Sequence, residues 1–503
     1  MSLDRIDPEF RALPLTALAD AALSRARDLG AEHADLRVER IVSQSVDLRD
    51  GTVTGVSDAT TVGLAVRVIV DGVWGFASHV ELTPERAAAT AERAVTVART
   101  LAPVAIERVE RADEPVHADA VWVSSYEVDP FTVPARDKVE LLGEWSQRLL
   151  AADGVDHVQA GVAQVRENKF YADLAGTRTT QQRVRIAPWF TATAVDRAAG
   201  GFETMSSLAP PAGRGWEYMT GGGWDFDGEI ALLPELLAEK MKAPSVAAGA
   251  YDLVIDPTNL WLTIHESVGH ATEYDRAIGY EAAYAGTSFA TPDKLGTLRY
   301  GSEHMHVTGD RTVPHGLATV GYDDDGVLTG AWDLVRDGVL VGYQLDRTFA
   351  PRLGLDRSNG CAFADSPHHV PIQRMANVSL RPDPRRDTTT EELIAGVERG
   401  IYVVGDKSWS IDMQRYNFQF TGQRFFRISG GKLAGQLRDV AYQATTTDFW
   451  GSLDAVGGPS TWVLHGAMNC GKAQPGQVAA VSHGCPSARF RGVNVLNTQE
   501  EGR

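Results

Sequence analysis

The N-terminal part of the chain shows a period-two alternation of apolar side chains that is interrupted at Asp-Gly pairs. The alternation ends first at Asp50-Gly51, resumes over Val62–Val70 and turns again at Asp71-Gly72. Successive side chains of a β-strand point to opposite faces of a sheet, and Asp-Gly is a strong hairpin signal. The pattern therefore predicts a meander of antiparallel strands. The alternating residues before the first turn are Leu36, Val38, Ile41, Val46 and Leu48.

Helical periodicity appears on both sides of this meander. A helix is expected over Leu15–Leu29, and another is expected to start at Thr83-Pro84 and to end near Leu101. The Thr83 hydroxyl can cap this helix, and proline is tolerated in a first turn. The N-terminal half is therefore expected to be an antiparallel sheet with helices. Later elements of this half are helices at about 138–152 and 229–242 and strands at about 158–165 and 184–195.

Strand signals dominate the second half of the chain and predict a curved sheet or a barrel-like body. A length of 503 residues exceeds what one hydrophobic core usually organises. We therefore expect an α+β fold with a first α+β domain over 1–115, a middle α+β domain with a flexible linker over 116–245, and a β-rich domain over 246–503. The strands expected in the last domain are Tyr251–Ile255, Gly330–Val335, Val339–Leu345 and Phe418–Ile428.

Charge and cysteine content narrow the possible partners and the compartment. The chain has 48 basic and 66 acidic side chains, a formal charge of −18, which disfavours nucleic acid and anionic membranes as partners. No secretory signal and no apolar run of roughly 20 residues is present, so a cytoplasmic location is expected. Three cysteines, Cys361, Cys470 and Cys485, do not resemble a disulfide framework.

A second strand-to-helix transition carries the residues that point to chemistry. Asp256-Pro257 can cap and open a helix that contains His265, Glu266 and His270. Imidazoles bind Zn²⁺, and an adjacent carboxylate can take a proton from a water whose pKa the ion lowers. The alternative is a packed helix with a hydrogen-bonded histidine and a salt-bridged glutamate.

The spacing of the two histidines is unusual, since they lie at positions i and i+5 rather than i and i+4. On a regular helix, such residues differ in direction by about 140°. A π-type turn would bring them together, and Gly269 would ease that distortion. A catalytic zinc also needs a third protein ligand. Cys470 and Cys485 are both candidates, and a small buried hydrophobe is the alternative for either one.

An ordered set of motifs resembles the landmarks of the TldD/PmbA peptidase family over roughly residues 20 to 495. The set is His265–Asp275, Arg357–Gly360, Arg374–Asn377, Gly400–Val403 and Asn469–Lys472. The resemblance implies a TldD-type, zinc-bearing subunit, with His265, His270 and Cys470 as Zn²⁺ ligands and Glu266 as general base. Cys485 matches no ligand position of the family and is interpreted as structural.

What the resemblance implies is a zinc metallopeptidase of the HExxxH type that hydrolyses small or unfolded peptides with low sequence specificity. It also implies a heterodimer with a PmbA/TldE-like partner that lacks the metal. The rival interpretation is a non-catalytic peptide-binding or regulatory subunit with a structural zinc. A nucleic-acid-binding role is a third interpretation, which the acidic charge disfavours.

The remaining motifs are weaker. His304 and His306 would share one face of an expected strand, which predicts packing or solvation more than substrate contact. Asp323–Gly326 lacks the ligand ladder of a calcium loop and predicts a turn. Gly221–Gly223 lacks the context of a phosphate loop and is expected to be a flexible connector.

Overall fold

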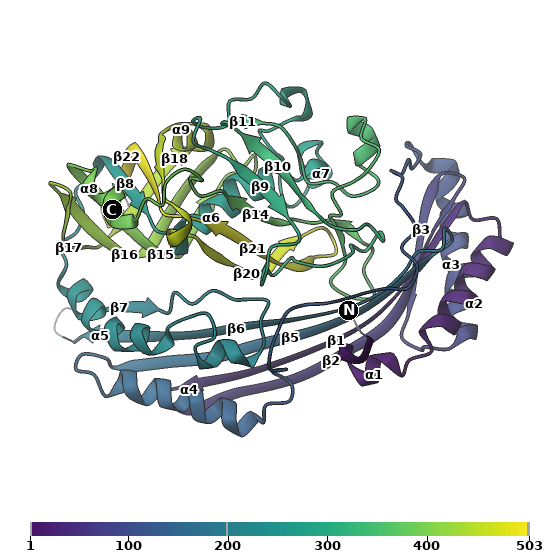
Figure 1. Cartoon of the computed structure of the whole chain (residues 1–503), viewed down its shortest axis with the longest axis horizontal. Helices are drawn as coiled ribbons and strands as arrows, with labels where there is room; N and C mark the ends of the chain where they lie inside the picture. The colour runs from purple at the N-terminus through teal and green to yellow at the C-terminus, as the bar shows by residue number, and fades with distance from the viewer. Residues whose placement is uncertain (1–2, 198–199, 500–503) are drawn as a thin grey trace.

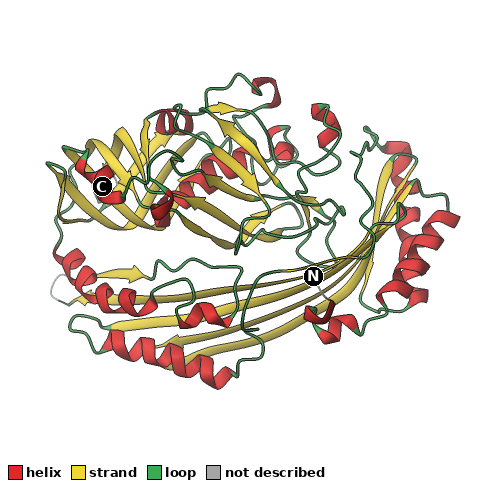
Figure 2. Cartoon of the chain, in the orientation of Figure 1, coloured by secondary structure: helices red, strands yellow, loops and turns green. Residues whose placement is uncertain are grey.

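The computed structural model describes residues 3–197 and 200–499. The chain is an α+β protein, as predicted, with a layer of long strands and helices from the N-terminal half beside a β-rich C-terminal region (Figures 1 and 2). In the described ranges, no helix is both long and apolar enough to cross a membrane.

The N-terminal half forms one seven-stranded sheet in the order β3-β2-β1-β5-β6-β4, with β7 on β6. The predicted hairpins are confirmed: β1 and β2 turn at Asp50-Gly51, and β2 and β3 turn at Asp71-Gly72. β1 pairs with β5 from Asp35 to Arg49, so the segments 1–115 and 116–245 both contribute strands to this sheet. The strands are β1 His33–Arg49, β2 Thr52–Val70, β3 Val73–His79, β4 Ala120–Val123, β5 His157–Asp173, β6 Arg178–Asp196 and β7 Gly201–Ser206.

Helices pack near both ends of this sheet (Figure 1). The predicted start of α3 is confirmed, because the Thr83 hydroxyl accepts a hydrogen bond from the Arg86 amide at 3.3 Å and Pro84 opens the helix. The side of α3 that packs on the sheet is lined by buried alanines, which allow a close approach. The helices of this half are α1 Pro8–Arg11, α2 Leu15–Asp28, α3 Pro84–Leu101, α4 Ala135–Leu150 and α5 Phe226–Lys242.

The C-terminal region contains a closed five-stranded barrel, which confirms the barrel-like alternative. β8 runs parallel to β15, and the barrel closes where β15 pairs with β16. Its strands are β8 Gly249–Ile255, β15 Arg399–Ile411, β16 Asn417–Ser429, β18 Val440–Thr445 and β22 Ala488–Asn497, with β17 Lys432–Leu437 and β19 Leu453–Val456 at its margins.

Smaller sheets and short helices surround the barrel. A four-stranded sheet has the order β11-β10-β9-β14, and two hairpins are formed by β12 with β13 and by β20 with β21. Their strands are β9 Val307–Asp310, β10 Ala331–Arg336, β11 Val339–Leu340, β12 Ala362–Phe363, β13 Ile372–Gln373, β14 Asn377–Leu380, β20 Val463–Lys472 and β21 Gln477–Cys485. The helices are α6 Pro257–Ile264, α7 Tyr274–Ala277, α8 Thr390–Ala395 and α9 Thr446–Gly451.

Two local predictions were wrong. The strand expected over Val339–Leu345 ends at Leu340. His304 and His306 do not lie on a strand, because the chain turns there and β9 begins only at Val307.

Buried ion pairs join the N-terminal sheet to the C-terminal region. Lys169 of β5 donates to Asp324 at 2.7 Å, and Arg67 of β2 pairs with Asp325. Within the sheet, Glu167 accepts hydrogen bonds from Arg183 and Arg185. The predicted turn at Asp323–Gly326 is confirmed. The carboxylates of Asp324 and Asp325 in this turn form the ion pairs with the N-terminal sheet.

Candidate metal centre

The helix that carries the histidines begins as the sequence predicts. The Asp256 side chain accepts a hydrogen bond from the Thr258 amide at 3.0 Å, and Pro257 occupies the first turn. Every residue of α6 is buried, and the helix packs against β15, β20 and β21. The packing of α6 therefore fixes the direction in which the next turn presents its side chains.

A single π-helical turn, His265–Gly269, follows α6 and confirms the distortion inferred from the spacing. The amide of His270 donates to the carbonyl of His265, which is the i to i+5 bond of such a turn. The role expected for Gly269 was wrong, because its φ of −54° is ordinary helical backbone. A side chain there would instead collide with Met375, whose sulfur would lie 2.6 Å from the added Cβ.

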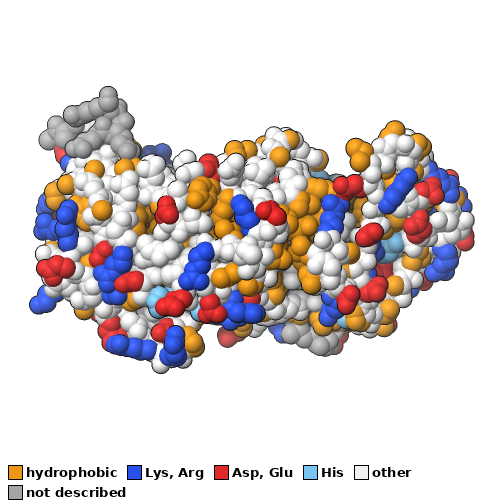
Figure 3. All heavy atoms as spheres, turned by 90° about the horizontal axis from the view of Figure 1, so that it is seen from above, with side chains coloured by type: hydrophobic (Ala, Val, Ile, Leu, Met, Phe, Trp, Pro, Cys, Tyr) orange, Lys and Arg blue, Asp and Glu red, His pale blue; other side chains and the backbone are white. Residues whose placement is uncertain are grey.

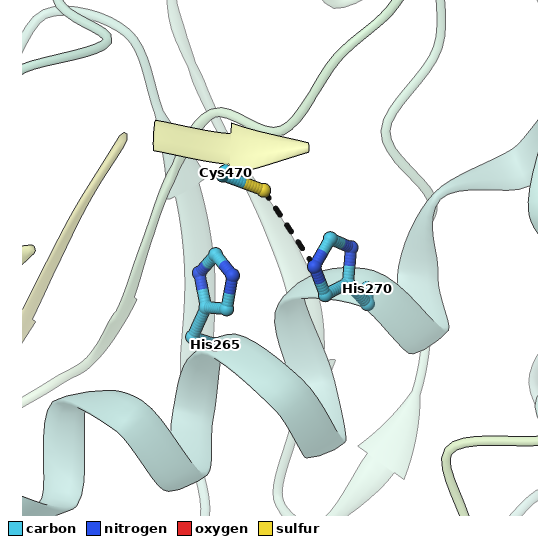
Figure 4. A group of neighbouring side chains, drawn as sticks. All are labelled: His265, His270 and Cys470. Atoms are coloured by element: carbon cyan, nitrogen blue, oxygen red, sulfur yellow. Dashed lines mark hydrogen bonds between the residues drawn. The ribbon is translucent and has the colours of Figure 1, made fainter. Parts of the chain in front are cut away.

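Cys470, from β20, completes a group of three buried ligand atoms with His265 and His270 (Figure 4). The three atoms lie within 4.8 Å of one another, and the Cys470 sulfur lies 3.6 Å from Nε2 of His270. Ordinary Zn–S and Zn–N bonds at a tetrahedral angle place sulfur and nitrogen about 3.6 Å apart. This donor set therefore fits a zinc ion.

The hydrogen bonds of His265 determine which of its ring nitrogens can bind a metal. Nδ1 of His483 lies 2.8 Å from the Val378 carbonyl oxygen, which can only accept, so this Nδ1 carries a proton. Burial lowers the pKa of His483 far below its usual value, so the ring is neutral and its Nε2 is an acceptor. Nδ1 of His265 lies 2.7 Å from that Nε2 and donates to it. The lone pair of His265 is therefore on Nε2.

A carboxylate orients His270 in the same way. Nδ1 of His270 lies 2.8 Å from Oε2 of Glu273 and donates to it, which leaves the Nε2 lone pair available to a metal ion. Oε1 of the same carboxylate accepts from the Lys472 ammonium at 3.1 Å, and the ammonium also donates to Asp275 at 2.8 Å. Lys472 thus ties the strand that carries Cys470 to the residues that follow His270.

The three cysteines differ in environment. Burial would raise the pKa of Cys470, but the neighbouring His270 and Arg374 outweigh this effect and lower it. Burial raises the pKa of Cys361 to about 12 and that of Cys485 well above its usual value. Cys485 donates to the Pro257 carbonyl and lies outside the group of ligand atoms. Cys470 is thus the thiol suited to bind a metal.

Glu266 is buried beside the two histidines, with 6% of its surface exposed. Its Oε2 accepts a hydrogen bond from Nη1 of Arg415 at 2.5 Å. Burial would raise the pKa of Glu266, but the nearby histidines and Arg415 outweigh burial and lower it. The carboxylate is therefore held ionised next to the ligand atoms.

Two residues that contact the candidate site were not predicted from the sequence. His483 and Arg415 lie far along the chain from the residues they contact and belong to no recognisable spacing. His304 and His306 lie outside the group of ligand atoms. The Arg374–Asn377 segment lies behind the site, where Arg374 donates to the Cys470 carbonyl at 2.6 Å.

Comparison with known protein sequences identifies relatives of this chain. Family profiles described as the PmbA/TldA metallopeptidase C-terminal domain and domain 1 match residues 248–497 and 34–98. A metalloprotease of Methanothermobacter thermautotrophicus is 29% identical over 93% of this chain and 96% of its own. A zinc metalloprotease TldD homolog of Saccharolobus solfataricus is 21% identical over 94% and 98% of the two chains.

Solved structures share the fold. TldE from Thermococcus kodakarensis aligns with a TM-score of 0.69 and 15% identity over 95% of this chain and 99% of its own. A protein from Thermotoga maritima MSB8 aligns with a TM-score of 0.74 and 16% identity over 95% and 99% of the two chains.

These relatives and the His-His-Cys group define a protein of the metalloprotease class. The chain belongs to the PmbA/TldD metallopeptidase family, as the ordered motifs predicted.

Proposed function

We propose that this chain is a zinc peptidase of the HExxxH type that hydrolyses small or unfolded peptides with low sequence specificity. One observation carries the proposal: a single distorted helical turn brings His265 and His270 together with Cys470, and Glu266 lies on that same turn. A packed structural helix would have no need of the π-turn that makes the two histidines converge.

His265, His270 and Cys470 would hold Zn²⁺, the zinc-bearing arrangement expected of a TldD-type subunit. When bound, the ion supplies a Lewis acid that polarises the peptide carbonyl and makes water acidic enough to attack near neutral pH. Glu266 would take the proton from the attacking water and deliver it to the leaving amine. His483 and Glu273 keep the two histidine rings in the required tautomers.

An exposed strand edge supports the binding of extended peptides. β15 continues to Ile411, but β8 pairs with it only from Gly400 to Val403. The side chains from Lys407 to Ser410 are exposed, and no described strand pairs with that edge of β15. A peptide added there would be held mainly through its backbone, which is consistent with the low sequence specificity that we propose.

This edge lies close to the candidate centre. The Trp261 indole of α6 donates to Asp406 of β15 at 3.1 Å, and Trp409 of the same strand interacts with Glu266. A peptide paired with this edge would therefore pass beside the proposed general base.

We also propose that the chain works in the cytoplasm as the catalytic member of a heterodimer with a TldE-like subunit. Support comes from the family and from TldE of Thermococcus kodakarensis, which shares the fold over 95% of this chain. The acidic charge disfavours a nucleic-acid partner, because it repels the phosphate backbone. In the view from above, acidic and basic side chains are interspersed, and this face has no continuous basic region (Figure 3).

The rival candidate is a non-catalytic, peptide-binding subunit with a structural zinc, and the slight exposure of Glu266 is the observation that favours it. Cleavage of an unfolded polypeptide, by the chain alone and with its partner, separates the two. Turnover that a chelator abolishes and Zn²⁺ restores supports the peptidase. Peptide binding without cleavage in both preparations supports the rival.

A further inference from the structure

We propose that Arg415 is a positioning residue for the reaction, which holds the Glu266 carboxylate by Oε2 so that Oε1 receives the proton of the attacking water. This inference rests on the proposed peptidase function. Arg415 lies in the turn between β15 and β16, and nothing in the sequence motifs marks it.

Both terminal nitrogens of the Arg415 guanidinium are committed. Nη1 donates to Oε2 of Glu266 at 2.5 Å, and Nη2 donates to the Ala285 carbonyl at 3.0 Å. A guanidinium is planar and presents its donors in a fixed fork. The carbonyl of Ala285 therefore fixes the plane of the fork, and the fork, together with the Trp409 side chain that also hydrogen-bonds to Glu266, fixes the carboxylate.

The backbone of Arg415 is held equally firmly. Its amide donates to the Asp412 carbonyl at 3.0 Å, and its carbonyl accepts from the Thr446 hydroxyl at 2.8 Å. The side chain is 13% exposed, so water competes little for the guanidinium. The ion pair thus has one well-defined geometry.

The conformation of Arg415 indicates that the side chain, rather than the turn, requires an arginine. Its φ of 64° lies in the left-handed region, which glycine or asparagine adopts at lower cost. The turn is already stabilised by Asp412, whose Oδ1 accepts from the amides of Gln414 and Tyr416 at 3.1 and 2.8 Å. An arginine at this strained position is explained by its contact with Glu266.

The pairing of Oε2 decides how the proton moves. An arginine keeps its own proton at any working pH, so it cannot take the proton from Glu266. Because Oε2 is paired with Arg415, Oε1 takes the proton as the water oxygen bonds to the carbonyl carbon. The same proton passes to the amine as the C–N bond breaks. A carboxylate that rotates freely would spend less time in this orientation.

The test compares Arg415→Gln and Arg415→Lys with wild type in steady-state hydrolysis of an unfolded polypeptide, with zinc content and Tm measured on each protein. For Arg415→Gln we expect kcat to fall about 100-fold with KM within about threefold, since a misplacement of about 1 Å can cost that much. Bound zinc should stay at wild-type level. Millimolar guanidinium should restore part of the lost kcat, an effect that a purely structural role would not produce.

Arg424 offers the matched control, because it is a buried arginine on β16 whose ion partner is Glu229 of α5, at 3.7 Å. Arg424→Gln should keep kcat within about threefold and should not respond to guanidinium, since the ion partner of Arg424 is Glu229 rather than Glu266. The Arg415→Lys variant keeps the charge but not the fork, and we expect an intermediate kcat with an unchanged Tm.

A kcat for Arg415→Gln within threefold of wild type would overturn the proposal, as would a loss that guanidinium leaves untouched and that accompanies loss of zinc. If Arg415→Gln does not fold, a folded Arg415→Lys with wild-type kcat overturns it instead. Glu266→Gln in the same assay tests the proposed function separately. Equal turnover by wild type and Glu266→Gln refutes the peptidase mechanism, whereas an inactive Glu266→Gln beside a fully active Arg415→Gln refutes only the role of Arg415.

Discussion

Nδ1 of His265 lies 2.7 Å from Nε2 of His483 and is oriented by it, although 218 residues separate the two along the chain. Removing such a partner typically lowers metal affinity 10- to 100-fold. We therefore expect His483→Ala to weaken zinc binding by roughly that factor, measured by competition with a chromophoric chelator. His306→Ala, which lies outside the site, should bind zinc like wild type. Unchanged affinity in His483→Ala would show that His265 needs no such partner.

The choice between Cys470 and Cys485 can be tested by zinc content. Cys470→Ala removes a thiol that lies 3.6 Å from Nε2 of His270, whereas Cys485→Ala removes a thiol that donates only to the Pro257 carbonyl. We expect Cys470→Ala to lose most of its zinc and Cys485→Ala to retain it, measured by elemental analysis after dialysis. Retention by Cys470→Ala would exclude it as a ligand.

Gly269 should be intolerant of a side chain because of packing. An added Cβ would lie 2.6 Å from the Met375 sulfur. Overpacking of this kind costs about 1–3 kcal/mol, so Gly269→Ala should lower the free energy of unfolding by that amount. In a Met375→Ala background the cost should largely disappear. An equal cost in both backgrounds would point to backbone strain instead.

Glu167 gives a prediction for the dependence of stability on pH. Burial would raise its pKa, but Arg183 above all, together with Arg185, lowers it well below the usual value. A carboxyl group whose folded pKa is depressed contributes stability above its unfolded pKa, and this contribution is lost as the pH falls towards the folded value. Glu167→Gln should therefore be about 3–5 kcal/mol less stable than wild type at pH 7.

The difference should shrink below about pH 4.5, where the unfolded carboxyl group takes up a proton. Denaturant unfolding followed at several pH values measures it. Glu140→Gln is the control, because Glu140 is exposed on α4 and its change should alter stability by less than about 0.5 kcal/mol at either pH. A difference that stays constant from pH 7 to pH 3 would contradict the assignment to ionised Glu167.

Features with a local cause could be predicted from the sequence. The hairpins follow from Asp-Gly turns, which adopt positive φ at Asp50 and Gly51. The start of α3 follows from Thr83-Pro84. The π-turn could be inferred because a five-residue spacing leaves no regular helix able to bring His265 and His270 together.

Features that depend on distant contacts could not be predicted in this way. The pairing of β1 with β5 and the closure of the barrel join segments far apart in the chain, so no local pattern reports them. His483 and Arg415 carry no spacing signal, because their partners lie on other elements. Gly269 was assigned the wrong role for the same reason: the Met375 side chain that excludes a Cβ is remote in sequence.

The central claim is zinc-dependent peptide hydrolysis through Glu266. Its most direct test is a titration of the metal-free chain, co-purified with the proposed TldE-like partner, with Zn²⁺ while cleavage of an unfolded polypeptide is recorded for wild type and Glu266→Gln. We predict that wild-type activity rises and saturates at about one zinc per chain, because residues 3–197 and 200–499 contain one such group of ligand atoms. Glu266→Gln should bind the same zinc without turnover. Full cleavage without metal, or equal cleavage by Glu266→Gln, would contradict the claim.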